Sequence, residues 1–422
     1  MKYTLRYIFI ALLFAGCADK VEIEQSQAET FNKLYGNAGN DSGCEIRELP
    51  DGSFLILATI ETLNPDRLSE IALIKTDKFG NEVWRDTYGR EGEDKAGGMD
   101  ISQNGNILIG GTSYNVGTTA EDSNHSDIIV IELNSDLQVL NERTFSQFMD
   151  NEVCNTILYD DSNVGGYIIG GSTDKADSTG LATQSRSPTA NDKFSKDFLT
   201  IRVFQEGGNE VVDDFNAGFE SDDEIKSCVL SGDEFDNILF TGYSVENGIE
   251  KPIILNIRNK NDGIPINNFR ELELGSNSTG NKIIRIDDGF SILGTSQSSQ
   301  AFFIQELGND KLLRGSPFEY RKNGNFIAND FVFNDLTKNY LIAGTTNDSD
   351  LSQGGGFDHY IASIKNDGKI NWEKTYGGTG DEEALAIAPT KDGGYIITGY
   401  TGFEGNSLIN TIKVDNKGIL NP

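Results

Sequence analysis

Histidine and basic residues are scarce in this chain of 422 residues. Its only two histidines, His125 and His359, are too few for a histidine-based catalytic triad or a multi-histidine zinc site. Its 35 lysines and arginines face 66 acidic residues, which gives a formal net charge of −31. Nucleic-acid binding depends on lysine and arginine displacing counterions from phosphates, so this charge argues against a nucleic-acid partner.

Proline is depleted as well, with eight residues, whereas glycine is abundant, with 47. This balance favours many short strands joined by glycine-containing turns. Hydrophobic residues make up 37% of the chain, which is enough for a continuous core. Length alone would suggest two or three domains, but a single repetitive all-β domain can also reach this size.

Cysteine occurs only four times. Cys44, Cys154 and Cys228 are far apart in the sequence, and each falls in the same type of strand of the repeat described below. One disulfide with one free thiol is possible, but the pattern favours three small apolar side chains in the core.

The fourth cysteine, Cys17, ends a signal-peptide pattern. Lys2 and Arg6 accompany an apolar run over 7–14 that is too short to span a membrane, and Ala-Gly-Cys follows. Small residues directly before a cysteine resemble the lipobox of bacterial lipoproteins. The resemblance implies that cleavage leaves Cys17 as the first residue and that lipid is attached to it. An ordinary secretory signal with an incidental cysteine is the alternative.

The resemblance predicts three segments: a signal peptide over 1–16, a lipidated cysteine with a polar tether over 17–29, and a folded body over 30–422. Acyl chains such as palmitate on one cysteine would hold the protein on a membrane without crossing it. Ala18 follows the cysteine in place of the aspartate that resembles an inner-membrane retention signal. We therefore predict an outer-membrane lipoprotein of the cell envelope, with the side of the membrane left open.

A strand repeat organises the body. An apolar run that leads into Gly and Thr residues occurs seven times, at Phe54–Thr59, Asn106–Thr112, Gly166–Thr173, Asn237–Tyr243, Phe290–Thr295, Tyr340–Thr345 and Tyr395–Thr401. The period is about 57 residues, just above that of propeller blades. Each repeat holds short β-type runs separated by Gly, Asn and Asp turns. The pattern predicts an all-β fold, a seven-bladed β-propeller of four-stranded antiparallel blades.

The last repeat lacks its fourth strand, and the start of the body supplies one. Residues Phe31–Gly36 read FNKLYG and align with WRDTYG at Trp84–Gly89 and WEKTYG at Trp372–Gly377. We predict that residues 30–36 complete the last blade and close the ring, because an open array would leave an exposed sheet edge at each end.

The phrase WEKTYGGTGDEEA at Trp372–Ala384, followed by DGGYIITGYT at Asp392–Thr401, resembles a repeat of secreted propeller-like proteins and lipoproteins of Gram-negative bacteria. The resemblance implies a propeller in the envelope and no particular activity. A second similarity joins Asp77–Trp84 to the docking repeat of pyrroloquinoline-quinone dehydrogenases. Only two copies carry the tryptophan and the cofactor-binding residues cannot be placed, so no cofactor is predicted.

Acidic residues recur in the loops of one predicted face. With the strands of a blade labelled a to d from the centre outward, the d-to-a and b-to-c loops share that face. We predict an acidic binding face there, because binding residues tend to lie on loops held by a rigid scaffold. Its d-to-a residues are Asp41, Glu93, Asp94, Asp150, Glu152, Asp222, Asp223, Glu224, Asp381, Glu382 and Glu383.

Two b-to-c loops of this face stand out. Asp348, Asp350 and Asp358 could offer oxygen ligands to calcium, with glycines at 354–356 permitting a tight wrap. Their spacing is not that of an EF-hand, and a solvated loop is the favoured alternative. The insertion Thr173–Lys196 is either a partner contact or tolerated length, and the second is favoured.

Three functions follow from these features. The favoured one is a non-enzymatic binding or scaffold module that engages a protein or glycan through the acidic face. A polysaccharide-processing enzyme with paired carboxylates is the alternative. Against it, the acids follow the repeat, so no catalytic residue is predicted. A structural subunit of an envelope complex is the third.

Overall fold

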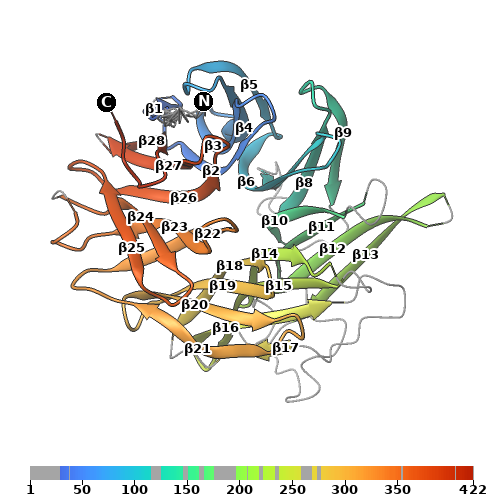
Figure 1. Ribbon diagram of the computed structural model, residues 1–422. Helices are drawn as coiled ribbons and strands as arrows, with labels where there is room; N and C mark the ends of the chain where they lie inside the picture. Colours follow the sequence, from blue (N-terminus) through green and yellow to red (C-terminus); the bar gives the residue numbers. More distant parts are fainter. Residues whose placement is uncertain are drawn as a thin grey trace, which may run out of the picture.

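The computed structural model describes residues 29–37, 39–115, 125–145, 151–160, 166–174, 196–206, 208–217, 222–232, 237–257, 269–272, 277–352, 355–403 and 405–421. Cys17, the predicted tether up to residue 28 and most of the insertion at 173–196 lie outside these residues. The described residues form 28 β-strands and no helix (Figure 1). Accordingly, none of them belongs to a helix that could cross a membrane.

Five sheets have four antiparallel strands each. The strands, in sheet order, are β10 (Glu152–Asp160), β11 (Gly166–Thr173), β12 (Asp197–Glu206) and β13 (Asn209–Ala217); β14 (Glu224–Leu230), β15 (Ile238–Glu246), β16 (Ile249–Ile257) and β17 (Phe269–Glu271); β18 (Ser278–Ile286), β19 (Gly289–Ser296), β20 (Ala301–Gly308) and β21 (Leu313–Tyr320); β22 (Phe326–Asn334), β23 (Asn339–Thr346), β24 (Asp358–Lys365) and β25 (Ile370–Tyr376); and β26 (Glu382–Pro389), β27 (Tyr395–Phe403), β28 (Asn406–Val414) and β1 (Phe31–Tyr35).

The remaining sheet has eight strands. They are β2 (Ser42–Glu48), β3 (Phe54–Asn64), β4 (Arg67–Thr76), β5 (Glu82–Tyr88), β6 (Gly92–Ile101), β7 (Ile107–Asn115), β8 (Ser126–Leu133) and β9 (Val139–Phe145). Within it, β4 and β6 pair in parallel through Arg67 with Gly92 and Ser69 with Glu93.

The prediction of seven separate four-stranded blades is therefore wrong. The fold is propeller-like, with five four-stranded sheets and one eight-stranded sheet. The long β3–β4 hairpin brings the start of β4 beside the loop that precedes β6. There Arg67 Nη2 donates to Gly89 O at 2.7 Å, and Gly92 N donates to Asp66 O at 2.9 Å. These contacts join β2–β5 and β6–β9 into one sheet, although the sequence repeat predicts two separate blades there.

The sheets surround a common centre (Figure 1). The innermost strands are β2, β6, β10, β14, β18, β22 and β26; each contacts the next, and β26 contacts β2. Each innermost strand has a register shift at an equivalent place, such as Cys154/Thr156 and Ala384/Ala386. Between the sheets lie apolar clusters, for example that of Ile46, Ile56 and Ile396.

The register shift explains the glycine of the repeat. A Cβ at Gly171 would lie 1.7 Å from Val153 O, and one at Gly399 would lie 1.8 Å from Glu383 O. The bulge pushes a carbonyl of the innermost strand toward its neighbour, where only glycine leaves room. The repeated apolar-then-glycine pattern is thus a packing requirement of the ring.

The N-terminal strand completes the last sheet. β1 pairs antiparallel with β28 from Phe31–Lys413 to Tyr35–Ile409, which confirms the predicted pairing of residues 30–36. Phe31 packs edge-on against Phe54 of β3, with ring centroids 6.0 Å apart. Tyr35 Oη donates to Gly80 O at 2.7 Å. The closing strand therefore also contacts the neighbouring sheet.

A buried hydrogen-bond chain ties β24 to this closure. Asn410 Nδ2 donates to Asn32 Oδ1 at 2.6 Å and to Lys33 O at 3.3 Å, so Asn410 Oδ1 is the acceptor toward His359. His359 Nε2, at 2.8 Å, must then carry the hydrogen. Burial lowers the pKa of His359 to about 4, although Asn410 and Asp358 act in the opposite direction.

The closing strand offers a matched pair of substitutions. Phe31 is 9% exposed and Leu34 is 54% exposed. Phe31→Ala should lower the free energy of unfolding by about 3 kcal/mol, because it empties a packed site. Leu34→Ala should cost less than about 1 kcal/mol. Denaturant unfolding measures both, and equal losses would contradict the closure.

His359 should make stability depend on pH. The unfolded imidazole titrates at its ordinary pKa of 6.5, and the folded one at about 4. The unfolded chain therefore binds the extra proton first as pH falls, and stability is lost from pH 6.5 down toward 4. Between pH 7 and 5 the loss should be about 2 kcal/mol. Denaturant unfolding of wild type and His359→Gln should show this loss only in wild type; the same slope in both would refute the assignment.

Candidate functional site

Two faces of the ring differ in their connections. The loop face carries the b-to-c hairpins and the connections between successive strand groups, such as residues 36–41 and 377–381. The turn face carries the a-to-b and c-to-d turns, such as residues 77–81 and 390–394. All predicted acidic-face residues that the structure describes belong to the loop face or to the strand ends beside it.

Three of these acids do the same structural job. Asp41, Asp94 and Glu382 each accept the backbone N–H of the residue four positions earlier. The distances are 2.7 Å from Arg90 N to Asp94 Oδ2 and 2.9 Å from Gly378 N to Glu382 Oε2. All three acids are buried. The acid recurs in these three loops because each of them presents the same N–H group, which needs an acceptor.

The same acids also fasten these loops to the adjacent hairpins. Asp41 Oδ1 accepts Glu61 N at 2.9 Å, and Glu382 Oε1 accepts Thr401 Oγ1 at 2.8 Å. Burial raises the pKa of Asp41, and the N–H donors only partly offset it. These carboxylates stabilise the loops and are not free to bind a ligand.

The other predicted acids are also engaged within the protein, apart from Asp150, which lies outside the described residues. Their partners are Lys95 for Glu93, Lys196 N for Asp222, Val245 N for Asp223, Lys226 for Glu224, Phe357 N for Asp381 and Tyr400 for Glu383. Glu152 is fully buried. Each of these described acids therefore has a partner or is buried within the protein, and their predicted role in binding stays a prediction.

The candidate calcium residues are not gathered into a ligand set. Asp348 is buried and accepts Asn323 N at 2.9 Å and Asp350 N at 2.9 Å. Asp358 is buried, whereas Asp350 is exposed. Across the described ranges, no group of three or more His, Cys, Asp or Glu residues could hold a metal ion.

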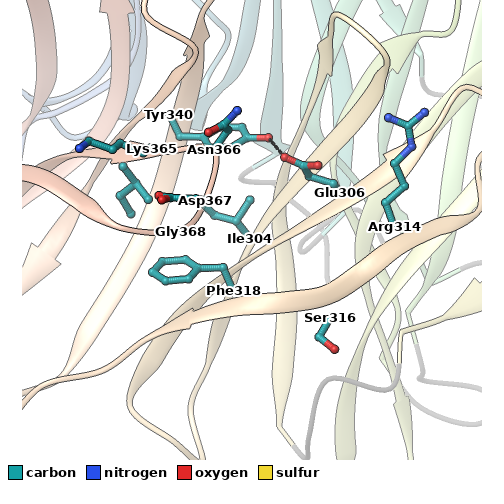
Figure 2. A pocket seen from close by; sticks show the side chains of 11 residues that line it. Ile304, Glu306, Arg314, Ser316, Phe318, Tyr340, Lys365, Asn366, Asp367 and Gly368 are labelled. Carbon is teal, nitrogen blue, oxygen red and sulfur yellow. Dashed lines mark hydrogen bonds between the residues drawn. The ribbon is translucent and has the colours of Figure 1, made fainter.

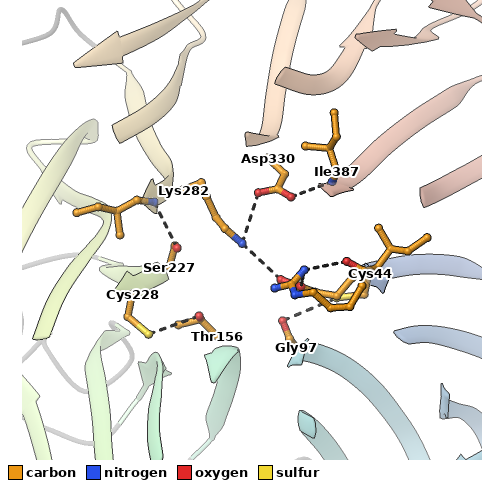
Figure 3. A network of polar contacts seen from close by, with 12 residues as sticks. Cys44, Gly97, Thr156, Ser227, Cys228, Lys282, Asp330 and Ile387 are labelled. Carbon is orange, nitrogen blue, oxygen red and sulfur yellow. Dashed lines mark hydrogen bonds and ion pairs between the residues drawn. The ribbon is translucent and has the colours of Figure 1, made fainter. Parts of the chain in front are cut away.

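Charged side chains that break the repeat meet at the centre of the ring (Figure 3). Lys282 Nζ of β18 lies 3.4 Å from Glu45 Oε1 of β2 and 3.4 Å from Asp330 Oδ1 of β22. Arg47 Nη1 lies 2.6 Å from Glu45 Oε2. Asp330 Oδ2 accepts Ile387 N of β26 at 2.9 Å. We call Glu45, Arg47, Lys282 and Asp330 the central network.

The two carboxyls of the central network differ in acidity. Burial alone would raise the pKa of Glu45, but the positive charges of Arg47 and Lys282 outweigh it and lower that pKa. Burial raises the pKa of Asp330, and Lys282 offsets this only in part. None of these four residues was predicted as a site residue, because the predicted acids all lie in or beside the loops. Charged residues at inner-strand positions that are small or apolar in other copies were the available signal.

Three cysteines, Cys44, Cys154 and Cys228, also lie on innermost strands and are free. Cys44 Sγ lies 3.7 Å from Gly97 O, and Cys228 Sγ lies 3.6 Å from Thr156 Oγ1 (Figure 3). Burial raises the pKa of Cys44 and of Cys228 to about 12, and raises that of Cys154 as well. All three are neutral thiols at neutral pH, and therefore poor nucleophiles.

A pocket of about 260 Å³ opens between β20–β21 and the β24–β25 turn on the turn face (Figure 2). Ile304, Phe318 and Tyr340 form its apolar part, and Tyr340 Oη donates to Glu306 Oε1 at 2.7 Å. Its volume is below the roughly 300–1,000 Å³ of small-molecule sites. This pocket does not point to a substrate.

No protein-family model and no curated protein sequence matches the chain. Similar solved structures include a protein of unknown function from Dyadobacter fermentans, 8% identical with a TM-score of 0.46 over 90% of this chain and 97% of that one. Trypanosoma rangeli sialidase in complex with sialic acid is 10% identical, with a TM-score of 0.42 over 92% of this chain and 57% of that one. The dihydro-heme d1 dehydrogenase NirN in complex with DHE is 10% identical, with a TM-score of 0.45 over 91% of this chain and 77% of that one. At TM-scores under 0.5 these likenesses carry no argument about function.

The central network predicts that replacing Lys282 lowers the free energy of unfolding more than replacing an exposed lysine does. Lys282→Met leaves the buried Asp330 carboxyl without its cation and Glu45 with Arg47 alone, and should lower the free energy of unfolding by about 3 kcal/mol. Lys95→Met breaks an exposed pair with Glu93 and should cost under about 1 kcal/mol. Denaturant unfolding compares the two. If Lys282→Met lowers the free energy of unfolding no more than Lys95→Met does, the central network does not stabilise the fold.

Proposed function

We propose that this protein is a lipid-anchored, non-enzymatic binding module of the outer membrane that holds a partner protein on its loop face. The lipid would be attached at Cys17. The polarity of the closing strand is the observation that carries this proposal. β1 begins at the turn face, where Phe31 pairs with Lys413, and ends at the loop face, where Tyr35 pairs with Ile409. A membrane anchor that precedes β1 therefore enters at the turn face and leaves the loop face directed away from it.

The loop face offers a rigid surface with apolar contact points. Its hairpins are fastened by buried carboxylates, as at Asp41 and Glu382. Leu63 and Phe403 project from neighbouring hairpin tips and are 94% and 61% exposed. Asn40, between these hairpins, forms a bridge with Ser407. Exposed apolar residues on a rigid frame favour a protein partner over a glycan.

The centre supports binding over catalysis. Glu45 and Asp330 are the carboxyl pair that an enzyme of the paired-carboxylate type would need. Lys282 lies within 3.4 Å of both. Both carboxyls are therefore held in ion pairs with the same ammonium group.

The proposal predicts that capture of a partner depends on the loop face. The lipidated full chain in vesicles would serve as bait for solubilised envelope proteins, with and without calcium. A stoichiometric protein should bind wild type and Leu140→Asp, a variant on the outer strand β9 at a site that is 54% exposed. It should be lost at least about tenfold from the double variant Leu63→Asp, Phe403→Asp, because buried charges oppose the contact.

Two outcomes would contradict the proposal. Capture that is equal for both variants would remove the loop face from the contact. Capture of polysaccharide alone would identify a glycan partner and revive the enzyme alternative. If every copy of this protein in the envelope is found bound to the partner in a fixed ratio, the protein is a subunit of a larger complex and uses the same face.

A further inference from the structure

We propose that the turn face lies against the lipid surface, so that its apolar turn tips enter the membrane interface. This inference rests on the proposed lipid anchor and adds an orientation to it. Four large apolar side chains project from turns of this face: Phe79, Leu312, Leu336 and Ile419. Their exposed fractions are 48%, 51%, 95% and 41%.

The four tips form one arc of the ring. Leu312 follows β20, Leu336 joins β22 to β23, Ile419 follows β28, and Phe79 joins β4 to β5. These strands belong to successive sheets, whose innermost strands β18, β22, β26 and β2 contact one another in that order. The apolar tips therefore lie on four consecutive strand groups of the turn face.

The turns hold their tips outward by local hydrogen bonds. Asp77 Oδ1 accepts Phe79 N at 2.9 Å, and Asp415 Oδ1 accepts Ile419 N at 2.8 Å. Asn334 Oδ1 accepts Leu336 N at 3.0 Å. An apolar side chain that projects from a fixed turn cannot be buried within the protein itself. A lipid interface is a surface that would cover several such tips at once.

Each tip is accompanied by a lysine. Lys78 precedes Phe79 and lies 4.6 Å from the centre of its ring. Lys311 precedes Leu312, Lys338 follows Leu336 by two residues, and Lys417 precedes Ile419 by two. A long side chain beside an apolar tip can place its ammonium at the headgroups while the tip goes deeper. Two of these lysines also pair with acids of the same face, Lys78 with Glu29 and Lys338 with Asp287.

The chain enters the fold at this arc. Glu29 Oε1 lies 3.5 Å from Lys78 Nζ, and Lys413 Nζ donates to Glu29 O at 2.6 Å. Eleven residues, 18–28, separate Glu29 from Cys17, and such a segment reaches at most about 40 Å. A lipid on Cys17 would therefore hold the Phe79 side of the ring near the bilayer.

Two sites of equal exposure test the orientation. Leu336 on the turn face is 95% exposed, and Leu63 on the loop face is 94% exposed. The lipidated full chain would carry Leu336→Cys or Leu63→Cys, labelled near neutral pH with an environment-sensitive fluorophore, since the native cysteines are neutral thiols. In phosphatidylethanolamine–phosphatidylglycerol vesicles with doxyl lipids, the probe at 336 should be quenched at least about twofold and the probe at 63 should not.

A background substitution tests the neighbouring tips. Phe79→Ser with Ile419→Ser should reduce quenching of the probe at 336, whereas Leu63→Ser with Phe403→Ser should leave it unchanged. No quenching at 336, or equal quenching at both probes, would overturn the inference. Flotation with the vesicles tests the lipid anchor separately. If flotation does not depend on Cys17, the proposed lipid anchor is wrong. The orientation that was argued from that anchor is then wrong as well.

Discussion

The pairing of β1 with β28 is the constraint on which the rest of the structure depends. The two strands come from opposite ends of the body and pair over five residues. Without that pairing, β28 would present an unpaired edge, and the cluster that includes Phe31, Tyr35 and Ile409 would lose its outer strand. The entropy of closing so long a loop grows only slowly with its length, so a short strand with buried aromatic side chains can hold the ring.

The same pairing gives the molecule a direction. A strand that closes the ring must start at one face and end at the other, and β1 starts at the turn face. Everything that precedes residue 29 therefore joins the protein on that side. The loop face is then opposite to the side at which the chain enters β1. The polarity follows from backbone register and does not depend on any single side chain.

Much of this architecture could be predicted from the sequence, because its causes are local or periodic. The all-β repeat and the orphan strand FNKLYG both appear as patterns, and Gly171 and Gly399 mark a bulge that recurs around the ring. The fusion of two strand groups was not predictable. It depends on Arg67 reaching Gly89 and on two parallel residue pairs, none of which leaves a periodic mark.

The repeated acids show why periodicity is a poor guide to a binding site. A residue such as Asp41 or Glu382 recurs because every loop of its type leaves the same N–H group in need of an acceptor. A ligand, in contrast, is bound at one place and needs residues that depart from the repeat.

The departures in this chain are of two kinds. Lys282 and its carboxyl partners face inward and neutralise one another, which suits a structural role. The apolar tips at Leu63, Phe403, Phe79 and Leu336 face outward and contact nothing that would bury them. The two proposals assign contacts to those tips, with a partner protein at the loop-face pair and the membrane interface at the turn-face pair.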